Sequence, residues 1–296
     1  MSKSIVFGAN GYIGRHLVHY LKESGHEVIP CGHANDSIDD LNDYVQIDVT
    51  NPESLSKADL KVDYVFVFSG MTGTGASFDQ FPKFIDVNEK GLLNILNHFK
   101  KSGARIIFPS TRLVYRGKEK VKLKEDGELL AKTIYAQNKI ACESYLNMYY
   151  NMHGLAHNIF RICVPYGNIF DGSYSYGTVG FFLKGAMNAK KITLYGDGLQ
   201  MRTFTHVEDI CRIIIHTIKQ PASENQTFNI GSEDHLSLLD AAKVVAKKYE
   251  SSIENIEWPK LALTLESGDT IFDDEKILKL GTYKYLHQFN NWIDSL

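Results

Sequence analysis

Cysteine is scarce in this sequence, and no pair of cysteines has metal-binding or redox spacing. The 296 residues contain four, each within or beside an apolar stretch and none in a Cys-x-x-Cys arrangement: Cys31, Cys142, Cys163 and Cys211. Reduced thiols in the core are therefore expected, in place of disulfides or a cysteine metal site. His153, His157 and His206 also lack ligand spacing, so no metal centre is predicted.

Long apolar runs and a strong net charge are absent as well. No run approaches the roughly 18–20 residues of a membrane span, and Ile5-Val-Phe7 is too short for a signal peptide. The formal charge of −3 provides no broad basic field, which argues against nucleic acid or an anionic membrane as the main partner. We expect a globular cytoplasmic protein without internal repeats or a long linker.

Short apolar runs alternate with amphipathic stretches through the first half of the chain. Six runs are predicted as strands: Ser4–Phe7, Glu27–Cys31, Tyr44–Ile47, Val62–Phe68, Arg105–Phe108 and Ala156–Ile162. Later segments predict a further strand at Gln226–Ile230. Stretches with helical spacing are Tyr12–Ser24, Val87–Lys100, Tyr135–Met152, Val179–Asn188, Val207–Ile218, Leu236–Lys248 and a short one near Phe289–Leu296. This alternation predicts an α/β fold with a parallel sheet covered by helices.

The glycine-rich segment Gly8-Ala-Asn-Gly11-Tyr-Ile-Gly14 follows the first predicted strand and opens the first predicted helix. A dinucleotide pyrophosphate needs backbone N–H groups at close range and the positive end of a helix, and glycine permits that approach because it lacks Cβ. The context therefore predicts a dinucleotide cofactor, with a strand-to-helix turn that binds nothing as the alternative.

The choice between NAD and NADP depends on the end of the second strand. An acidic residue at that place often binds the ribose 2′-hydroxyl of NAD, but Gly32 stands near it here. Arg15 lies just after the third glycine and is within reach of a 2′-phosphate, so NADP is favoured, although Asp36 to Asp43 is acidic. Asp48, after the third strand, is placed to accept from the adenine amino group or to cap the following loop.

Tyr135 and Lys139 lie four residues apart in a predicted helix and so share one face. A tyrosine acting as a base near neutral pH needs its pKa lowered by about three units, and a lysine ammonium together with the nicotinamide charge can supply much of that. Thr111 or Ser110, after the strand Arg105–Phe108, offers a hydroxyl that orients a substrate alcohol or carbonyl. The alternative for Tyr135 and Lys139 is an ordinary surface pair.

Taken in this order, these residues resemble the extended short-chain dehydrogenase/reductase family, specifically its nucleotide-sugar epimerases, dehydratases and ketoreductases. The segment Leu194-Tyr-Gly-Asp-Gly-x-x-x-Arg202-Thr-Phe-Thr-His-Val-Glu-Asp209 closely follows a family signature, and Phe160-Arg161-Ile-Cys-Val-Pro-Tyr166-Gly167 resembles another. The resemblance implies a doubly wound (Rossmann) sheet in residues 1–167 and a smaller sugar-nucleotide-binding part in residues 168–296. A strand and helix near residues 205–232 would return to the sheet.

The resemblance also implies which residues contact each ligand. Catalysis is assigned to Thr111, Tyr135, Lys139 and Ser110. Cofactor contacts are expected from Gly8, Asn10, Gly11, Tyr12, Ile13, Gly14, Arg15, Gly32, His33, Asp48, Val49, Ser69, Gly70, Asn88, Tyr135 and Lys139. Substrate contacts are expected from Thr111, Tyr166, Asn168, Tyr195 and Arg202, with Arg202 on the diphosphate or, alternatively, in an ion pair with Asp209 or Glu208.

The loop Asn168–Gly177 is expected to act as a lid or to contact the nucleotide base. A homodimer through the helices Tyr135–Met152 and Val87–Lys100 is implied.

Departures from the family pattern bear on the reaction. In the 4,6-dehydratases an Asp-Glu pair follows the catalytic threonine, whereas Arg112-Leu113 stands here, which disfavours dehydration. The favoured hypothesis is an NAD(P)-dependent nucleotide-sugar epimerase that works through a 4-keto-hexose intermediate. An NADPH-dependent reductase of a nucleotide-4-keto-6-deoxyhexose is the alternative, and a non-catalytic NAD(P)-binding regulator is a rival from another class. The sugar and the nucleotide stay open.

Overall fold

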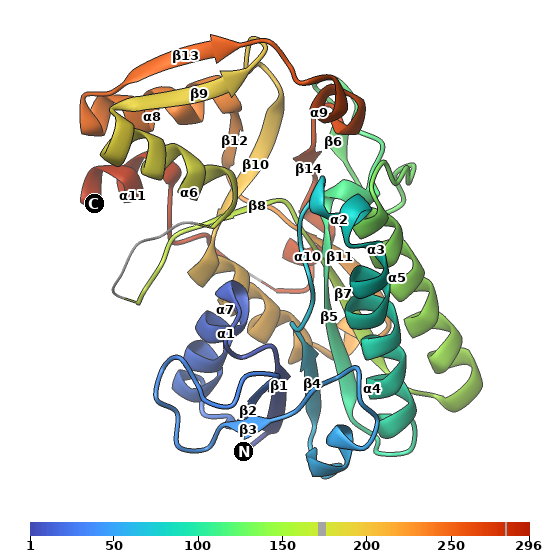
Figure 1. The fold of residues 1–296 in the computed structure, drawn as a ribbon. Coiled ribbons are helices and arrows are strands. Elements are labelled where there is room, and N and C mark those ends of the chain that lie inside the picture. Colours follow the sequence, from blue (N-terminus) through green and yellow to red (C-terminus); the bar gives the residue numbers. More distant parts are fainter. Residues whose placement is uncertain (171–175, 282) are drawn as a thin grey trace.

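A parallel sheet of seven strands forms the centre of the protein. The computed structural model describes residues 1–170, 176–281 and 283–296 (Figure 1). In spatial order the strands are β11 (Gln226–Ile230), β7 (His157–Ile162), β5 (Arg105–Thr111), β4 (Tyr64–Val67), β1 (Lys3–Phe7), β2 (Glu27–Gly32) and β3 (Val45–Gln46). Every neighbouring pair is parallel. The predicted α/β class with a doubly wound sheet is confirmed.

The order of the strands reverses between β1 and β4. The chain first runs outward from β1 to β2 and β3, then returns to β4 on the other side of β1 and continues outward to β5, β7 and β11. Loops leaving the carboxyl ends of β1 and β4 therefore diverge to opposite faces and leave a crevice between them. The glycine-rich segment follows β1 directly at this point.

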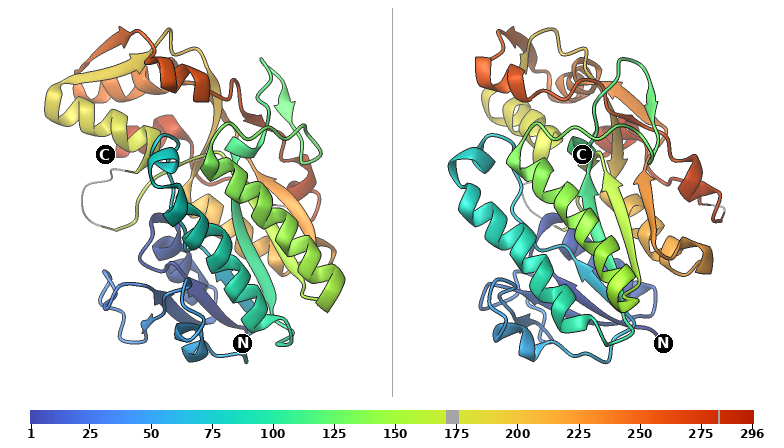
Figure 2. Two further views of the ribbon diagram at one scale, coloured as in Figure 1. Left: turned by 45° about the vertical axis from the view of Figure 1, so that its right-hand side comes forward. Right: turned by 90° about the vertical axis from the view of Figure 1, so that its right-hand side faces the viewer.

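Helices cover both faces of the sheet, as Figures 1 and 2 show. On one face α1 (Tyr12–Glu23), α7 (Val207–Ile218) and the short α10 (Glu275–Leu278) bury apolar side chains against it. On the other face α4 (Gly91–Phe99) and α5 (Ile134–His153) do the same. Both cores are almost completely buried, which makes the sheet a rigid support for the loops at its carboxyl edge.

Helix α5 carries an unusual polar face. Its start is fixed by Thr133, whose hydroxyl accepts the Ala136 N–H, and its end by Gly154 in the left-handed region at φ 68°. Four polar residues that recur at helical spacing are nevertheless buried: Tyr135, Asn138, Lys139 and Glu143. Burying such a set is costly unless each group has a partner or a task.

The C-terminal part builds smaller sheets beside the large one. A three-stranded sheet contains β8 (Val164–Tyr166), β10 (Met201–His206) and β12 (Asp234–Ser237), and two pairs join β9 (Lys191–Tyr195) to β13 (Ser252–Ile256) and β6 (Lys122–Leu123) to β14 (Ile271–Phe272). A third core packs these strands with α6 (Gly177–Lys184), α8 (Leu238–Tyr249) and α11 (Phe289–Ser295). β11 and α7 belong to the large sheet and its covering layer.

Several element boundaries differ from those predicted. The helix expected at Val87–Lys100 begins earlier, as the short helices α2 (Ala76–Asp79) and α3 (Phe81–Phe84) and the π-helix η2 (Ile85–Lys90) ahead of α4. A π-turn is favoured where a side chain must be redirected, and Asn88 lies within this one. β5 extends through Thr111, because it pairs with β7 over that whole length. Short elements that were not predicted include α9 (Lys260–Leu265) and the 3₁₀ turns η1 (Ser54–Lys57), η3 (Arg112–Val114) and η5 (Pro221–Ser223).

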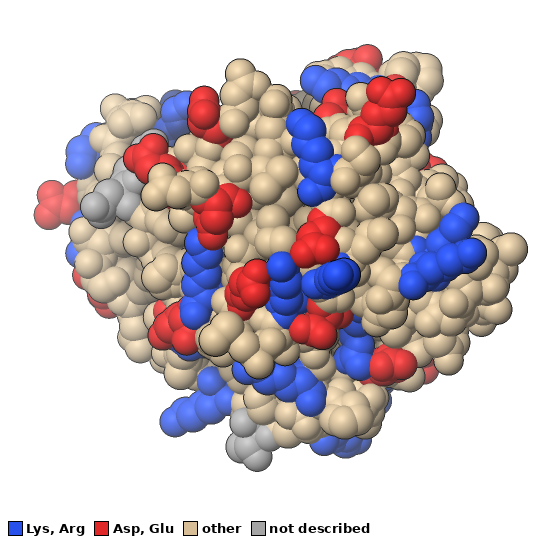
Figure 3. All heavy atoms as spheres, turned by 90° about the horizontal axis from the view of Figure 1, so that it is seen from below, with Lys and Arg blue, Asp and Glu red and all other residues tan. Residues whose placement is uncertain are grey.

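The surface carries charges of both signs. On the face drawn in Figure 3, lysine and arginine side chains are interspersed with aspartate and glutamate, without a continuous basic field. Within the residues that are described, none of the helices has the length and apolar character that crossing a membrane requires.

The buried ion pair between α5 and β7 generates a stability prediction. Arg161 donates from Nε and Nη2 to Glu143 at 3.0 and 2.6 Å, and both side chains are less than a tenth exposed. Glu143→Gln leaves a buried guanidinium without a counter-charge, so we expect the free energy of unfolding to fall by about 3 kcal/mol in urea denaturation. The matched control is Glu128→Gln, which breaks a half-exposed pair with Arg116 and should cost under about 1 kcal/mol. Equal losses in the two variants would contradict this account.

Candidate functional site: a dinucleotide cleft and its catalytic end

Two adjoining cavities lie where the strand order reverses. The larger has a volume of about 550 Å³ and the smaller about 310 Å³. They share the lining residues Gly11 and Phe68 to Met71, from the segments after β1 and β4. The two cavities together thus form one elongated cleft that begins at the glycine-rich turn.

Close backbone packing explains two of the three glycines in that turn. A Cβ on Gly14 would lie 2.1 Å from the Gly8 carbonyl oxygen, and a Cβ on Gly8, whose φ is 89°, would lie 2.4 Å from the Ser69 nitrogen. Gly11 is the N-cap of α1 and lines both cavities, and no side chain caps the helix there. The first turn of α1 also has no acidic residue. These features fit a bound phosphate group, because the first N–H groups of the helix open onto the cleft.

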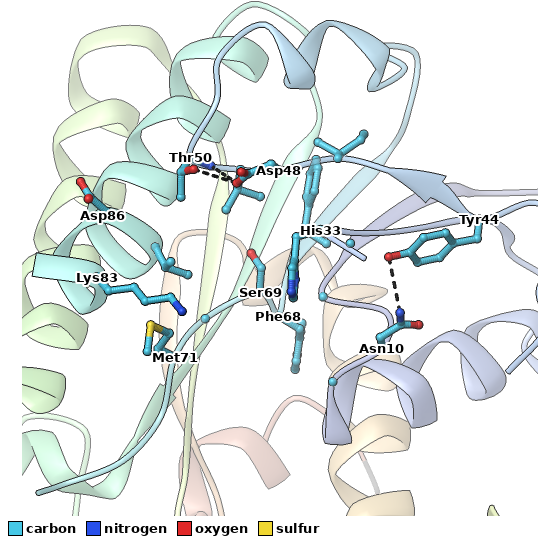
Figure 4. Close-up of a pocket in the computed structure, with 18 residues that line it drawn as sticks. Asn10, His33, Tyr44, Asp48, Thr50, Phe68, Ser69, Met71, Lys83 and Asp86 are labelled. Carbon is cyan, nitrogen blue, oxygen red and sulfur yellow. Dashed lines mark hydrogen bonds between the residues drawn. The ribbon is translucent and has the colours of Figure 1, made fainter. Parts of the chain in front are cut away.

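Figure 4 shows the larger cavity, where Asn10, His33, Tyr44, Asp48 and Ser69 surround the space. Asn10 holds the loop after β2 in place: its amide donates to the Asp36 carbonyl at 2.9 Å and its oxygen accepts the Ile38 N–H at 3.1 Å. Asp48 lines the cavity and also accepts the Thr50 N–H and hydroxyl at 2.9 and 2.8 Å. Both sequence-based interpretations of Asp48, a cleft acceptor and a loop cap, therefore agree with its position.

Gly32 has no side chain, which leaves room for the hydroxyl group of Tyr44. A Cβ at this position would lie 2.5 Å from the Tyr44 hydroxyl oxygen, which donates to the Ala34 carbonyl at 3.2 Å and lies 3.5 Å from the Asn10 amide nitrogen. At the end of β2 the acidic side chain is thus missing, and the phenol of Tyr44, which directly precedes β3, occupies the adjacent space.

Arg15 does not point its charge into the cleft. Its guanidinium pairs with both carboxylate oxygens of Asp39, from the acidic stretch after β2, and lies 4.0 Å from the centre of the Phe170 ring. Arg15 lines neither cavity. A 2′-phosphate would have to displace the Asp39 carboxylate to reach it.

Asn88 supports one wall of the cleft by binding the backbone of Met71. Its side-chain oxygen accepts the Met71 N–H at 2.7 Å, and its amide donates to the Met71 carbonyl at 3.1 Å. Asn88 therefore fixes the segment after β4, which carries Ser69 and Gly70 into both cavities. Asn88 itself lines neither cavity, so its contact with the cofactor stays a prediction.

The smaller cavity brings the predicted catalytic residues together. Thr111 and Ser110 at the end of β5 line it with Tyr135 and Lys139 from α5. The Lys139 ammonium donates to the Pro109 carbonyl at 2.7 Å and lies 6.0 Å from the centre of the Tyr135 ring. Among the described residues the buried Ser110 hydroxyl has no hydrogen-bond partner, and such an orphan in a cleft fits a ligand group that completes it.

Burial dominates the electrostatics of this cavity. It raises the pKa of Tyr135, and the hydrogen bond to the Thr111 hydroxyl only partly opposes this rise. Burial also lowers the pKa of Lys139 to about 8, and the Lys139 ammonium donates to the backbone. The predicted lowering of the Tyr135 pKa depends on the nicotinamide charge as well as on Lys139, so it stays a prediction for the complete complex.

Two further tyrosines, Tyr12 and Tyr176, line the smaller cavity together with Tyr135 and Lys139. Tyr176 lines the smaller cavity and stacks on Tyr12, with ring centres 4.4 Å apart. The Tyr12 hydroxyl donates to the Gly167 carbonyl at 2.7 Å and so ties α1 to the segment after β8. The loop predicted at Asn168–Gly177 includes residues 171–175, which lie outside the described residues.

The predicted substrate residues other than Thr111 lie away from the two cavities. Tyr166 is buried against Asp234, Asn168 accepts the Phe170 N–H, and Tyr195 is 43% exposed beside Trp258. Arg202 is only 1% exposed and pairs with Glu266 at 2.5 Å. The sequence-based alternative was an ion pair of Arg202 with Asp209 or Glu208. Arg202 does form an ion pair, but its partner is Glu266, so the predicted partners were wrong. The reason is that β10 places Arg202 beside the segment before β14.

Three side chains near α7 have metal-ligand chemistry, namely His206, Glu208 and His287, whose ligand atoms lie within 4.8 Å of one another. They are already engaged. His206 accepts the Glu208 N–H at the start of α7, and Glu208 pairs with Arg212 at 2.7 Å and with His287 at 2.9 Å. The two imidazole rings are stacked, which directs their lone pairs away from a common point.

Most predicted cofactor residues line the cleft, and some cleft residues were not predicted. Predicted residues outside the lining are Arg15 and Asn88. Residues that sequence reasoning missed are Phe7, Tyr44, Ile47, Thr50, Phe68, Met71, Thr72, Lys83, Asp86, Val87, Pro109, Ile162, Cys163 and Pro165. Except for Tyr44, Lys83, Asp86 and Val87, these residues end a predicted strand or follow one within four residues, and that adjacency was the available signal.

A phosphate-binding helix start next to a buried Tyr-Lys pair and a threonine defines a dinucleotide-dependent enzyme of the short-chain dehydrogenase type. The model of the NAD dependent epimerase/dehydratase family matches residues 4–231, and the chain belongs to that family. Relatives include a UDP-N-acetyl-alpha-D-glucosaminuronate decarboxylase of Bacillus cytotoxicus, 27% identical over 87% of this chain and 83% of that protein. A UDP-glucuronate 4-epimerase of Thermodesulfobacterium geofontis is 28% identical over 74% and 72%.

The fold is shared with solved structures. A UDP-glucose 4-epimerase of Thermus thermophilus in complex with NAD has a TM-score of 0.87 and 22% identity, over 99% of this chain and 96% of that one.

Proposed function

We propose that this protein is an NAD-dependent epimerase of UDP-activated sugars. The observation that carries this proposal is the meeting of Thr111, Tyr135 and Lys139 in a cavity continuous with the dinucleotide cleft. The family membership and the UDP-sugar names of its relatives support the substrate class. Those names include neutral hexoses and uronic acids, so the sugar is a separate question.

Each catalytic side chain has a task that its position supports. Tyr135 takes the proton from the sugar 4-hydroxyl and returns it, and Thr111 holds that oxygen through the hydroxyl that now bonds Tyr135. Lys139 keeps a positive charge close to the phenol once substrate excludes water. When bound, the nicotinamide cofactor supplies hydride exchange at C4 and a positive charge that favours tyrosinate. Ser110 offers its unpartnered hydroxyl to either ligand.

The alternative function is the NADPH-dependent reduction of a 4-keto sugar, which needs the same catalytic residues. It differs in net chemistry, because a reductase consumes reduced cofactor while an epimerase returns the hydride. Dehydration is disfavoured, since Arg112 and Leu113 offer neither an acid nor a base beside Thr111.

Removing the phenolic hydroxyl should abolish turnover without abolishing binding. We expect Tyr135→Phe to lower the rate of 4-epimer formation from a UDP-hexose or UDP-uronate by about 10³-fold, followed by NMR without added reductant. Tyr149→Phe, on the same helix but outside the cavity, is the control and should keep its rate. An active Tyr135→Phe enzyme would contradict the acid/base role, and stoichiometric NADPH consumption by the wild type would favour the reductase.

Our proposal of NAD departs from the sequence-based preference for NADP. That preference relied on Arg15 as a 2′-phosphate ligand and on the missing acid at Gly32. In the structure Arg15 is paired with Asp39, and the Tyr44 hydroxyl stands against Gly32. A 2′-phosphate would therefore lose its hydration without gaining the Arg15 guanidinium.

Releasing Arg15 should shift cofactor choice. We expect the wild type to bind NAD more tightly than NADP in calorimetric titrations. Asp39→Asn should narrow the difference by about tenfold, which corresponds to about 1.4 kcal/mol, because the guanidinium becomes available to the 2′-phosphate. Asp43→Asn is the control, since it breaks only the exposed pair with Lys22. Tighter binding of NADP by the wild type would overturn the assignment.

We also propose a homodimer that forms through α4 and α5. These helices lie side by side, and apolar side chains on α5 and on the neighbouring α3–η2 segment are at least 40% exposed: Phe81, Ile85, Met148, Tyr150 and Met152. Light scattering should give about twice the chain mass of 33.4 kDa. Met148→Lys should shift the mass toward the monomer, whereas Leu286→Lys, on the C-terminal segment, should not. A monomeric wild type would refute the dimer.

The cytoplasm is the proposed compartment. All four cysteines are buried and free, as in proteins that fold under reducing conditions. Fractionation of the producing cells tests this assignment, and recovery in the secreted fraction would contradict it.

A further inference from the structure

Two neighbouring guanidinium groups lie behind the smaller cavity, which neither of them lines, and only one of the two is paired with a carboxylate. Arg202 pairs with Glu266 and also donates to the carbonyls of Met201 and Gly268 at 2.8 and 2.6 Å. Arg112, at the start of η3, donates to the Ser267 hydroxyl at 2.8 Å and lies 3.5 Å from the Thr270 hydroxyl oxygen. Within the described part of the chain no carboxylate pairs with Arg112. The Arg112 guanidinium therefore has hydroxyl partners but no carboxylate bonded to it, although Glu266 lies near enough to favour its charge.

This charge persists at neutral pH. Burial, together with the nearby Arg202, lowers the pKa of Arg112 only to about 10. The side chain is partly buried, so a cation there without a paired carboxylate carries a desolvation cost that solvent relieves only in part. Hydroxyl partners compensate for only part of that cost, so the arrangement favours an anion from outside the chain.

The cluster lies next to the reacting centre. Arg112 follows Thr111 directly in the chain, and the Thr270 hydroxyl oxygen near its guanidinium is 3.7 Å from the Cys163 sulfur. Cys163 in turn lines the smaller cavity with Tyr135 and Thr111. One threonine and one cysteine side chain thus link the guanidinium to the space assigned to the sugar.

The proposed position of the sugar determines which of its groups lies near Arg112. This step rests on the proposed function, which puts the sugar O4 at Tyr135 and Thr111. In a pyranose, C4 is bonded to C3 and to C5, which carries C6, whereas the diphosphate on C1 lies across the ring. A group next to Thr111 is therefore closer to the C3 hydroxyl and to C6 than to the phosphates, and of these two only C6 can carry a carboxylate. A planar guanidinium matches a carboxylate through two parallel hydrogen bonds, and a hydroxymethyl group offers no charge to match.

We propose that Arg112 binds the C6 carboxylate of a nucleotide-activated uronic acid and so selects that substrate over the neutral hexose. Arg202 is held by Glu266 and completes the positive surroundings of this site. Ser267 and Thr270 orient the Arg112 fork through the two hydroxyl contacts described above.

The test compares three ligands by calorimetry in the presence of NAD: UDP-glucuronate, UDP-glucose and UDP. The wild type should bind UDP-glucuronate at least about tenfold more tightly than UDP-glucose, as expected for a charge-assisted hydrogen bond. Arg112→Gln keeps an amide donor for Ser267 but removes the charge, and should reduce this ratio to near one while leaving the affinity for UDP unchanged. Arg116→Gln, which breaks the half-exposed pair with Glu128, is the matched control and should keep the ratio.

Each of the other possible outcomes contradicts either the carboxylate site or the proposed function. Equal binding of the two sugars by the wild type refutes the carboxylate site, even if the variant fails to fold. A loss of UDP affinity in Arg112→Gln equal to the loss for UDP-glucuronate assigns Arg112 to the diphosphate and also refutes the proposal. If the wild type binds none of the three ligands, the proposed UDP-sugar function fails, and the carboxylate site fails with it.

Discussion

The approach of the Gly14 backbone to the Gly8 carbonyl is the contact on which the site depends. It lets α1 begin immediately after β1, so the helix starts at the crevice where the strand order reverses. The same reversal brings the segment after β4 against Gly8, where Ser69 leaves no room for a side chain. The cleft thus depends on this tight turn and on the strand order together.

The catalytic end depends on a different compromise. A buried lysine and a buried tyrosine are both costly as ions, and burial moves their pKa values in the directions that oppose charge. The chain stabilises the ammonium with a backbone carbonyl and connects the phenol to Thr111. Under the proposed function, the tyrosine ionises in the complete complex, in which ligand charges and hydrogen bonds replace water.

Periodicity and local motifs were sufficient to predict the parallel sheet, α1, α5, α7 and β11, because these signals are confined to short windows of sequence. The meeting of Thr111 with Tyr135 followed from order along the chain, since carboxyl ends of parallel strands share one edge. Pairings between distant residues could not be predicted in this way. Arg15 pairs with Asp39 in a loop, and Arg202 with Glu266 over 60 residues later, although both arginines had been assigned to ligand phosphates. Charge type was visible in the sequence, but the counter-ion was not.

The contact between Gly32 and Tyr44 links two positions that no local pattern connects. Because the phenol fills the volume of any Cβ at position 32, an acidic residue cannot be introduced there while the tyrosine keeps this rotamer. A side chain at position 32 therefore requires the Tyr44 phenol to move, and a displaced phenol loses its bonds to Ala34 and Asn10, which shape the loop after β2. The residue at the end of β2 and the conformation of the loop that follows it are thus coupled through one side chain.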